Sequence, residues 1–432
     1  ACELWDVPRG TLVGSLGVVD GTISAVPFPS GRRYFHVENS TTSETVGVWD
    51  VTQGRRVREA MHARVWGVSP DAERLIAIEA GRHRVNVTPV AGGGEVALRS
   101  VSDDVLDAGF IDRGVALAVR SRRGLHLWTE GDGAVVQTFG ARRASAFKVV
   151  FAPDGASILT ISGGATELRD AREGSLRATL ASAGSSLDVA RFAPDGQTLL
   201  MLHGDSVARL WSSRGGPSLH DLGWWQAPEQ WSNDGEPPDL ATRRDEARFS
   251  PDGARALTTG VEGDPSHARD TSPHEVRLWD VRRGQRLRTL PATEGDGVAT
   301  ARFMPGGARV FTTHGDLSAR IWDANTGEVR ATLPPTEGEI YDVWFSSDGA
   351  RVVTAHARAA LCSWSASDGR LRYTTRLAAG GLTQAMFSPD GARVFTTSSD
   401  HVDRVWEVAT GTLRAALSYG AEASTHAVFI PG

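Results

Sequence analysis

The side chains in this sequence that could bind a metal or move protons are histidines at corresponding points of a repeated pattern. His203, His314 and His356 each come just after a predicted second strand, and the first two precede Gly-Asp. A ring of imidazoles could hold a transition metal, because neutral histidine nitrogens are common metal ligands. The neighbouring copies of the pattern carry serine, glycine and valine at that point. We therefore expect no metal site.

The motifs of familiar catalytic sites do not occur in the sequence. It has no glycine-rich phosphate loop followed by lysine, no His-Glu-x-x-His and no Gly-x-Ser-x-Gly. Arginines recur at Arg191, Arg248 and Arg302, each directly before a phenylalanine, and this recurrence favours stacking or pairing between repeats. We predict no catalytic residues, no cofactor and no enzymatic activity.

Three tryptophans close together form the other chemically distinctive group. Trp224, Trp225 and Trp231 lie in the segment 215–245, which interrupts the repeat. Two interpretations are open. The rings could pack on their own repeat, or they could anchor a partner, since buried tryptophan and arginine dominate interface energetics.

A second interrupting segment, 261–274, carries His267, Arg269 and His274, which would border such a patch, although a lone loop histidine is more often only solvated. One segment joins a fourth strand to a first strand, and the other joins a second strand to a third. Because consecutive strands alternate in direction, both segments should emerge on the same face. The sequence thus predicts a protein or peptide partner on that face.

The repeated unit that positions these residues is clearest at 384–411. Its four predicted strands form an antiparallel meander with Pro-Asp-Gly in the first turn, where proline presets φ and glycine accepts a positive φ. The strands are expected at Gln384–Ser388, Arg393–Thr397, Asp403–Val408 and Leu413–Leu417. Such a unit has an apolar face that it cannot bury alone.

The third-strand tryptophan shows how far the unit recurs. Thr88 and Arg169 occupy its position in two degenerate copies. The tryptophan itself is found at Trp5, Trp49, Trp128, Trp211, Trp279, Trp322, Trp364 and Trp406. A period of about 40 residues with four strands fits a propeller blade better than a helical solenoid.

The units LWDV at 4–7, VWDV at 48–51, RLWDV at 277–281 and RIWDA at 320–324 resemble the WD40-repeat β-propellers, as do the APDG and SPDG turns. The resemblance covers essentially the whole chain. It implies an all-β fold, a β-propeller of four-stranded antiparallel blades. It also implies a non-catalytic interaction scaffold or sensor. Bacterial members of the family are often fused to signalling kinases or nucleotide-hydrolysing switch modules. The alternative is a hydrolase or lyase that uses the central pocket of the propeller.

One family element is missing. Blades of the family often carry a Gly-His pair whose histidine joins the third-strand tryptophan and a turn aspartate in a buried network. This chain lacks the pair but keeps the aspartate six residues before the tryptophan, at Asp205, Asp316 and Asp400. We interpret these aspartates as groups that fix a turn.

Composition limits the class of protein. The net charge of −6, with both signs interspersed, does not indicate nucleic-acid binding, and no apolar run approaches the length of a membrane span. Two cysteines, Cys2 and Cys362, are too few for a disulfide framework. Lys148 is the only lysine among 46 basic residues, which is typical of a high-GC bacterial genome. We expect a cytoplasmic bacterial protein.

Residues 1–432 form one array of about ten units that starts and stops in mid-repeat. Residues 3–16 supply only a third and a fourth strand, and 424–430 supply only a first. We expect a segment of a longer polypeptide, the other interpretation being a mature protein with a three-stranded closing blade. Two arrangements fit the count. In one, 1–313 form a seven-bladed propeller, closed by pairing 3–16 with 299–313, and 314–432 begin a second propeller. In the other, all units form a single ring.

Overall fold

The structure is a computed structural model of the 432-residue chain. Up to residue 140 it describes only the strands. Beyond that it describes the backbone of 147–162, 165–171, 173–180, 187–203, 207–224, 247–260, 275–291, 297–356, 360–376, 382–388, 391–398 and 402–418. The described residues form strands and turns, and no helix occurs among them. Accordingly, this part of the chain contains no helix that could cross a membrane.

The strands pair into a two-stranded sheet and nine four-stranded antiparallel sheets, which we call blades. Up to residue 140 the strands are β1 (Glu3–Asp6) and β2 (Thr11–Ser15); β3 (Ile23–Pro27), β4 (Arg33–Asn39), β5 (Glu44–Asp50) and β6 (Arg55–Met61); β7 (Ala63–Val68), β8 (Arg74–Glu79), β9 (Val85–Pro89) and β10 (Val96–Ala97); and β11 (Val105–Ile111), β12 (Ala116–Ser121), β13 (Gly124–Thr129) and β14 (Val135–Gly140).

The remaining strands form six blades in chain order. They are β15 (Phe147–Phe151), β16 (Ser157–Ser162), β17 (Ala165–Asp170) and β18 (Leu176–Thr179); β19 (Leu187–Phe192), β20 (Thr198–His203), β21 (Val207–Ser212) and β22 (Ser218–Trp224); β23 (Ala247–Phe249), β24 (Arg255–Gly260), β25 (Glu275–Asp280) and β26 (Gln285–Leu290); β27 (Val298–Phe303), β28 (Arg309–His314), β29 (Ala319–Asp323) and β30 (Val329–Leu333); β31 (Ile340–Phe345), β32 (Arg351–His356), β33 (Ala360–Ser365) and β34 (Leu371–Arg376); and β35 (Leu382–Phe387), β36 (Arg393–Ser398), β37 (Val402–Glu407) and β38 (Leu413–Ser418).

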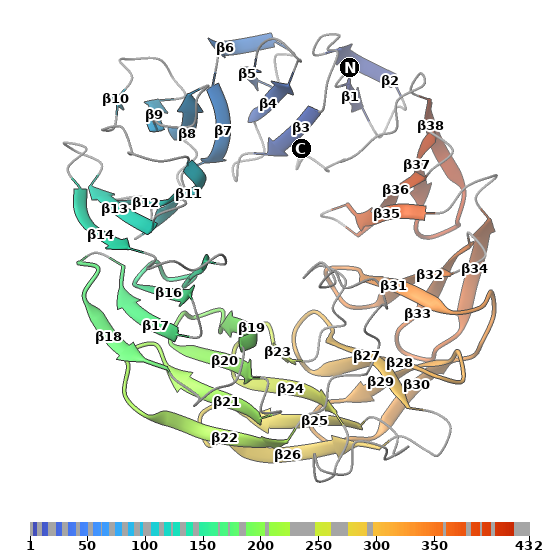
Figure 1. Ribbon diagram of the computed structural model, residues 1–432. Helices are drawn as coiled ribbons and strands as arrows, with labels where there is room; N and C mark the ends of the chain where they lie inside the picture. Colours follow the sequence, from blue (N-terminus) through green and yellow to red (C-terminus); the bar gives the residue numbers. More distant parts are fainter. Residues whose placement is uncertain are drawn as a thin grey trace, which may run out of the picture.

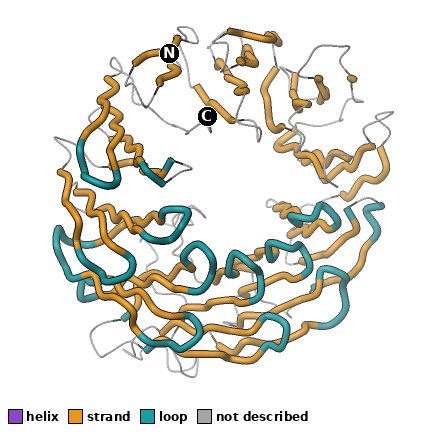
Figure 2. The backbone as a smooth tube through the Cα atoms, turned by 180° about the vertical axis from the view of Figure 1, so that it is seen from behind, coloured by secondary structure: helices purple, strands orange, loops and turns teal. Residues whose placement is uncertain are grey.

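The sheets follow one another in chain order around a common centre (Figure 1). The first strand of each blade lies toward the centre and the fourth lies at the rim. Neighbouring first strands touch, as β15 does with β19 and β31 with β35. The view from behind shows the turns of successive blades at corresponding places (Figure 2). This is the arrangement of a β-propeller, and it confirms the predicted all-β fold of four-stranded antiparallel blades.

The Pro-Asp-Gly turn joins first and second strands because its groups bond to one another. At 250–253 the amide of Gly253 donates to the carbonyl of Ser250 at 2.9 Å, and Gly253 has a φ of 70°. The Asp252 carboxylate accepts from the Ser250 hydroxyl at 2.5 Å and from the Ala254 amide at 3.0 Å. The Ser250 hydrogen bond in particular lowers the pKa of Asp252. The ionised Asp252 carboxylate is therefore favoured, and its hydrogen bonds stabilise the turn.

A bulge recurs where the third strand meets the fourth. The register shifts between Ile321 and Trp322, and likewise between Val405 and Trp406. The same shift precedes Arg169, in a copy that has lost the tryptophan. The bulge therefore belongs to the repeat and does not depend on the indole ring. It locally increases strand twist, which suits blades arranged around a centre.

The core lies between blades. Phe311 and Ile321 of one blade pack in one cluster with Val352 and Trp364 of the next. Trp279, Trp322 and Trp406 make corresponding contacts with the blade before their own. A blade cannot bury this apolar face by itself, so its stability depends on its neighbours.

The observed strand pairing can be compared with the predicted closure of a ring between 3–16 and 299–313. Among the described strands, β28 pairs with β29, in a blade with β27 and β30, and β1 pairs with β2 in a two-stranded sheet. The proposed pairing of 299–313 with 3–16 is therefore wrong, because those residues complete their own blade. The division into 1–313 and 314–432 stays a prediction, and the strand expected at 424–430 lies outside the described residues.

Candidate functional site

Four of the third-strand tryptophans make the same type of hydrogen bond, each within its own blade. Each indole N–H donates to a threonine hydroxyl in the second strand of its own blade, two residues beyond the tryptophan's cross-strand partner. The pairs are Trp279–Thr258 at 3.0 Å, Trp322–Thr312 at 2.8 Å, Trp364–Thr354 at 2.8 Å and Trp406–Thr396 at 2.9 Å. These indoles are at least 92% buried, so a missing acceptor would cost free energy.

In two blades a histidine extends this pair. His314 and His356 are the last residues of β28 and β32, and their Nε2 atoms lie 2.7 Å and 2.8 Å from the threonine hydroxyls. They are 4% and 1% exposed. Both histidines are thus tied into the blade instead of pointing to a shared metal. In these two blades a second-strand histidine joins the tryptophan through the threonine. The sequence signal was a Thr-x-His in which the threonine comes ten residues before the tryptophan.

The two histidines have opposite tautomers. Nδ1 of His356 lies 3.0 Å from the carbonyl oxygen of Gly338 and must donate to it, so Nε2 accepts from Thr354. Burial lowers the pKa of His356, which favours this neutral form. Nδ1 of His314 accepts from Arg320 at 2.8 Å, so its Nε2 donates to the threonine hydroxyl.

One of the three predicted turn aspartates, Asp316, lies among the described residues. Asp316 accepts from the amide of Ser318 at 2.8 Å and from Arg320 at 3.3 Å, and it thereby orders the turn between β28 and β29. Desolvation alone would raise the pKa of Asp316, but hydrogen bonding to Ser318 and the charge of Arg320 outweigh it, so the pKa is lowered. Asp205 and Asp400 lie outside the described residues.

Arginines at the start of the second strand connect neighbouring blades. Arg309 donates to the carbonyl oxygens of Gly349 at 2.6 Å and Ala366 at 3.3 Å, both in the next blade. Arg351 reaches the carbonyl oxygen of Val408, which corresponds to Ala366, at 3.3 Å. Ala366 and Val408 each follow a third strand, so Arg309 and Arg351 each tie two blades together.

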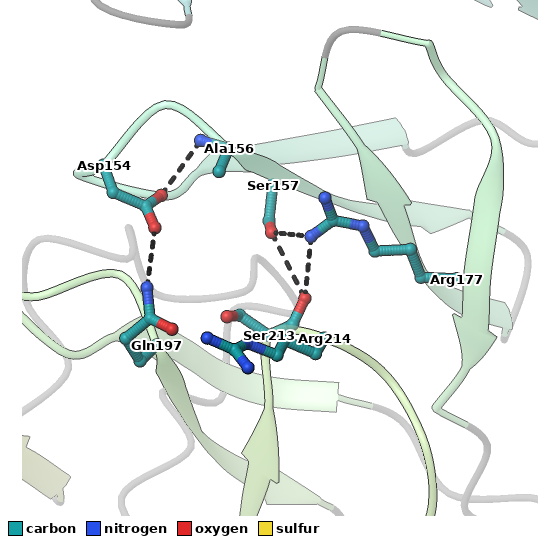
Figure 3. A pocket seen from close by; sticks show the side chains of 7 residues that line it. All are labelled: Asp154, Ala156, Ser157, Arg177, Gln197, Ser213 and Arg214. Atoms are coloured by element: carbon teal, nitrogen blue, oxygen red, sulfur yellow. Dashed lines mark hydrogen bonds between the residues drawn. The ribbon is translucent and has the colours of Figure 1, made fainter.

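In the blade β15–β18 this arginine is replaced by Ser157. A pocket of about 360 Å³ lies between this blade and the next. Its lining side chains come from two Pro-Asp-Gly turns, from β18 and from the turn after β21 (Figure 3). They are Asp154, Ala156, Ser157, Arg177, Gln197, Ser213 and Arg214. The pocket lies on the face that carries the Pro-Asp-Gly turns.

Arg177 takes over part of the missing contact. It donates to Ser213 O at 3.0 Å, the carbonyl that corresponds to Ala366 and Val408. It also donates to the Ser157 hydroxyl at 2.7 Å and pairs with Asp170. Across the pocket, Asp154 accepts from the Ala156 amide at 2.9 Å and from Gln197 at 3.2 Å (Figure 3).

The arginines before the first-strand phenylalanines lie on the innermost strands. Arg302 donates to Asp342 at 3.1 Å and to the carbonyl oxygen of Val343 at 3.2 Å, so it bridges two blades. Burial, and next the charges of Arg302 and Arg191, lower the pKa of Arg248 to about 10. The Arg302 contacts are of the pairing kind that the sequence favoured.

Of the six predicted partner residues, one lies among the described residues. Trp224 is the last residue of β22 and pairs with Val207, so the fourth strand extends into the segment 215–245. Trp225, Trp231, His267, Arg269 and His274 lie outside the described residues. Among the residues that are described, no group of three or more histidine, cysteine, aspartate or glutamate side chains could hold a metal ion.

Of the other repeat tryptophans, Trp5, Trp49 and Trp128 lie in the third strands β1, β5 and β13. Trp211 is buried in β21, but Met201 occupies the threonine position, and the indole nitrogen of Trp211 has no hydrogen-bond partner among the described residues. In this copy the ring is retained without its polar contact.

Comparison with known proteins places the chain by fold. No protein-family model matches the sequence, and no curated protein matches it. A eukaryotic initiation factor is similar in structure, with a TM-score of 0.58 and 13% identity over 90% of this chain and 96% of that one. The computationally designed Ika8 protein has a TM-score of 0.45 and 17% identity, over 80% and 96% of the two chains. The C-terminal WD40 domain of Sif2 has a TM-score of 0.41 and 15% identity, over 78% of this chain and 90% of that one. Such identities concern fold alone, and the fold is a β-propeller of four-stranded antiparallel blades.

Proposed function

We propose that this propeller is a non-catalytic platform, a scaffold or sensor that presents loops to a protein or peptide partner. The observation that carries the proposal is that its recurring polar side chains are engaged in holding strands and blades together. Trp322 with Thr312 is engaged within one blade, and Arg309 is engaged between two. A rigid support with variable loops is a common way to place recognition residues.

The proposed partner face is the one that carries the two interrupting segments. β22 ends at Trp224 and β23 begins at Ala247, and β24 ends at Gly260 and β25 begins at Glu275. Both connections leave neighbouring blades on the face opposite the Pro-Asp-Gly turns. The tryptophans of 215–245 would act as anchors, and the histidines and arginine of 261–274 would form the rim.

The wider context belongs to the same proposal. We infer a cytoplasmic protein that is part of a larger bacterial signalling protein, and a protein partner in preference to a nucleic acid, given the net charge of −6. The alternative, a hydrolase or lyase that uses the central pocket, has no observation among the described residues to favour it.

Iodide quenching of tryptophan fluorescence tests the anchor. The test variant is Trp224→Ala/Trp225→Ala/Trp231→Ala. The control is Val329→Ser/Leu371→Ser/Leu413→Ser, which alters exposed apolar side chains on outer strands. If the loop is an exposed anchor, the test variant loses most of the quenchable emission and keeps its melting temperature. It also stops capturing partners that the wild type and the control capture. A melting temperature several degrees lower with an unchanged quenchable fraction would contradict the proposal.

A further inference from the structure

The pocket beside Ser157 exists because a side chain is missing from the repeat. The residue that starts the second strand is arginine in β24, β28, β32 and β36. Arg309 and Arg351 cross to the next blade, and Arg255 bonds to Asn325 there at 2.6 Å. The Ser157 hydroxyl reaches only the carbonyl oxygen of Ser213, at 3.2 Å, and the rest of the space that an arginine would fill is left as a pocket of about 360 Å³. That volume is at the lower end of the range of small-ligand sites, which begins at about 300 Å³.

Within the described part of the chain, the opposite charges of Asp154 and Arg214 line the pocket without a direct ion pair. Both oxygens of Asp154 accept hydrogen bonds from Ala156 and Gln197, and Arg177 is paired with Asp170. Arg214 is exposed, and within the described part of the chain its guanidinium makes no ion pair or hydrogen bond. The N–H groups of the Arg214 guanidinium are therefore available to the pocket, while the Asp154 carboxylate adds one negative charge to the same lining.

We propose that this pocket binds a carboxylate group, held by the Arg214 guanidinium and by the hydrogen-bond donors beside it. A planar guanidinium presents paired N–H groups that match the two oxygens of a carboxylate. Gln197 lines the same space and has a second amide N–H beyond the one that it donates to Asp154, whereas the Ser157 hydroxyl is already donated to the carbonyl oxygen of Ser213 (Figure 3).

The same arrangement disfavours a phosphate group. A phosphate monoester carries up to two negative charges at neutral pH. Arg214 could compensate only one of them, and Asp154 lines the same small pocket. A second negative charge close to this carboxylate would be repelled. A singly charged carboxylate is therefore the better fit.

The carboxylate could be the end of a peptide chain or an aspartate or glutamate side chain. Saturation-transfer NMR distinguishes these sources with N-acetylglycylglycine and N-acetylaspartate amide, against neutral N-acetylglycinamide and inorganic phosphate. We expect saturation of at least one carboxylate probe on the full chain, none of the neutral probe, and no displacement by equimolar phosphate. The carboxylate probe that binds more tightly identifies the source.

Variants of the full chain then locate the binding. Ser157→Arg restores the repeat residue and should fill the pocket, and Arg214→Gln removes the charge; each should weaken binding about tenfold or more. The matched control is Thr198→Arg, at the corresponding position of the next blade, which should leave binding unchanged. Melting curves check that each variant is folded. Binding that survives Ser157→Arg, equal binding of the neutral probe, displacement by phosphate, or no binding of either carboxylate would overturn the proposal.

Discussion

Two pairs of blades in this propeller use the same backbone repeat differently. In β27–β34 each tryptophan has its threonine, each threonine has a histidine, and Arg309 ties the blades together. In β15–β22 the corresponding residues are Arg169 for tryptophan, Met201 for threonine and Ser157 for the bridging arginine. The bulges and strand registers persist in both pairs. The backbone therefore tolerates loss of the polar contacts, and the degenerate pair is where a pocket opens.

The largest effect is expected from breaking the complete network. Thr354→Val keeps the shape of the side chain but leaves the indole N–H of Trp364 and Nε2 of His356 without their shared hydroxyl. Each unsatisfied buried group costs about 1–3 kcal/mol, so we expect the free energy of unfolding to fall by about 3 kcal/mol. Urea unfolding measures it. The exposed Thr332→Val is the control, and an equal effect of the two variants would contradict the role of the network.

Replacing tryptophan with phenylalanine in both pairs sharpens the comparison. Trp322→Phe loses apolar volume and a hydrogen bond, whereas Trp211→Phe loses similar volume but removes a buried N–H that has no partner. We therefore expect Trp322→Phe to cost about 1–2 kcal/mol more than Trp211→Phe in unfolding free energy. The difference should appear as separate denaturant midpoints. Equal costs would mean that the Trp–Thr hydrogen bond contributes nothing net.

Exchanging the bridging residue tests whether the two pairs differ by this contact. Arg309→Ser removes hydrogen bonds to Gly349 and Ala366 and should destabilise the protein by about 1–2 kcal/mol. Ser157→Arg should stabilise it by about 0.5 kcal/mol, since Arg177 already occupies part of the contact. Differential scanning calorimetry measures both. A destabilising Ser157→Arg would show that the pocket cannot accept the repeat residue.

His356 should make the stability of the complete pair depend on pH. Its pKa in the folded protein lies below the unfolded value of about 6.5, because burial disfavours the charged form. The unfolded chain thus binds the proton first, and the stability that this histidine contributes above pH 6.5 is lost as the pH falls toward its folded pKa. His356→Gln should flatten the slope of unfolding free energy against pH in this window. An unchanged slope would contradict the neutral assignment.

The smallest effect is expected at the surface. Hydrogen bonds from Arg330 are the main cause that lowers the pKa of Asp323 to about 2, from an ordinary value of about 3.9. Because the pair is partly exposed, we expect Asp323→Asn to cost at most about 1 kcal/mol at neutral pH. The stability is present above pH 4 and lost as the pH falls toward 2, where mutant and wild type should converge. A cost that persists at pH 2 would point to packing instead.

Much of the fold could be predicted from sequence, because strand order, turns and the tryptophan position are local and repeated. Residues 402–407, for example, form a third strand with Trp406, close to the predicted 403–408. The pairing of 299–313 with 3–16 failed, since the choice between two sheet partners is a long-range one. The aromatic partner site stays a prediction. The sequence does show that serine replaces arginine after Pro-Asp-Gly-Ala at position 157. That this replacement leaves a pocket could not be predicted, because the sequence does not show which groups of the next blade the arginine would contact.

The sequence by itself determined the repeat, and with it the strands, the Pro-Asp-Gly turns and the apolar face that each blade must bury against its neighbour. These follow from side-chain type and spacing within about 40 residues. Only the tertiary structure decided which polar groups meet across blades, such as Ser157 with the carbonyl oxygen of Ser213. Such contacts join residues more than a blade apart in the chain. Their formation depends on how two whole sheets pack, which the local pattern does not encode.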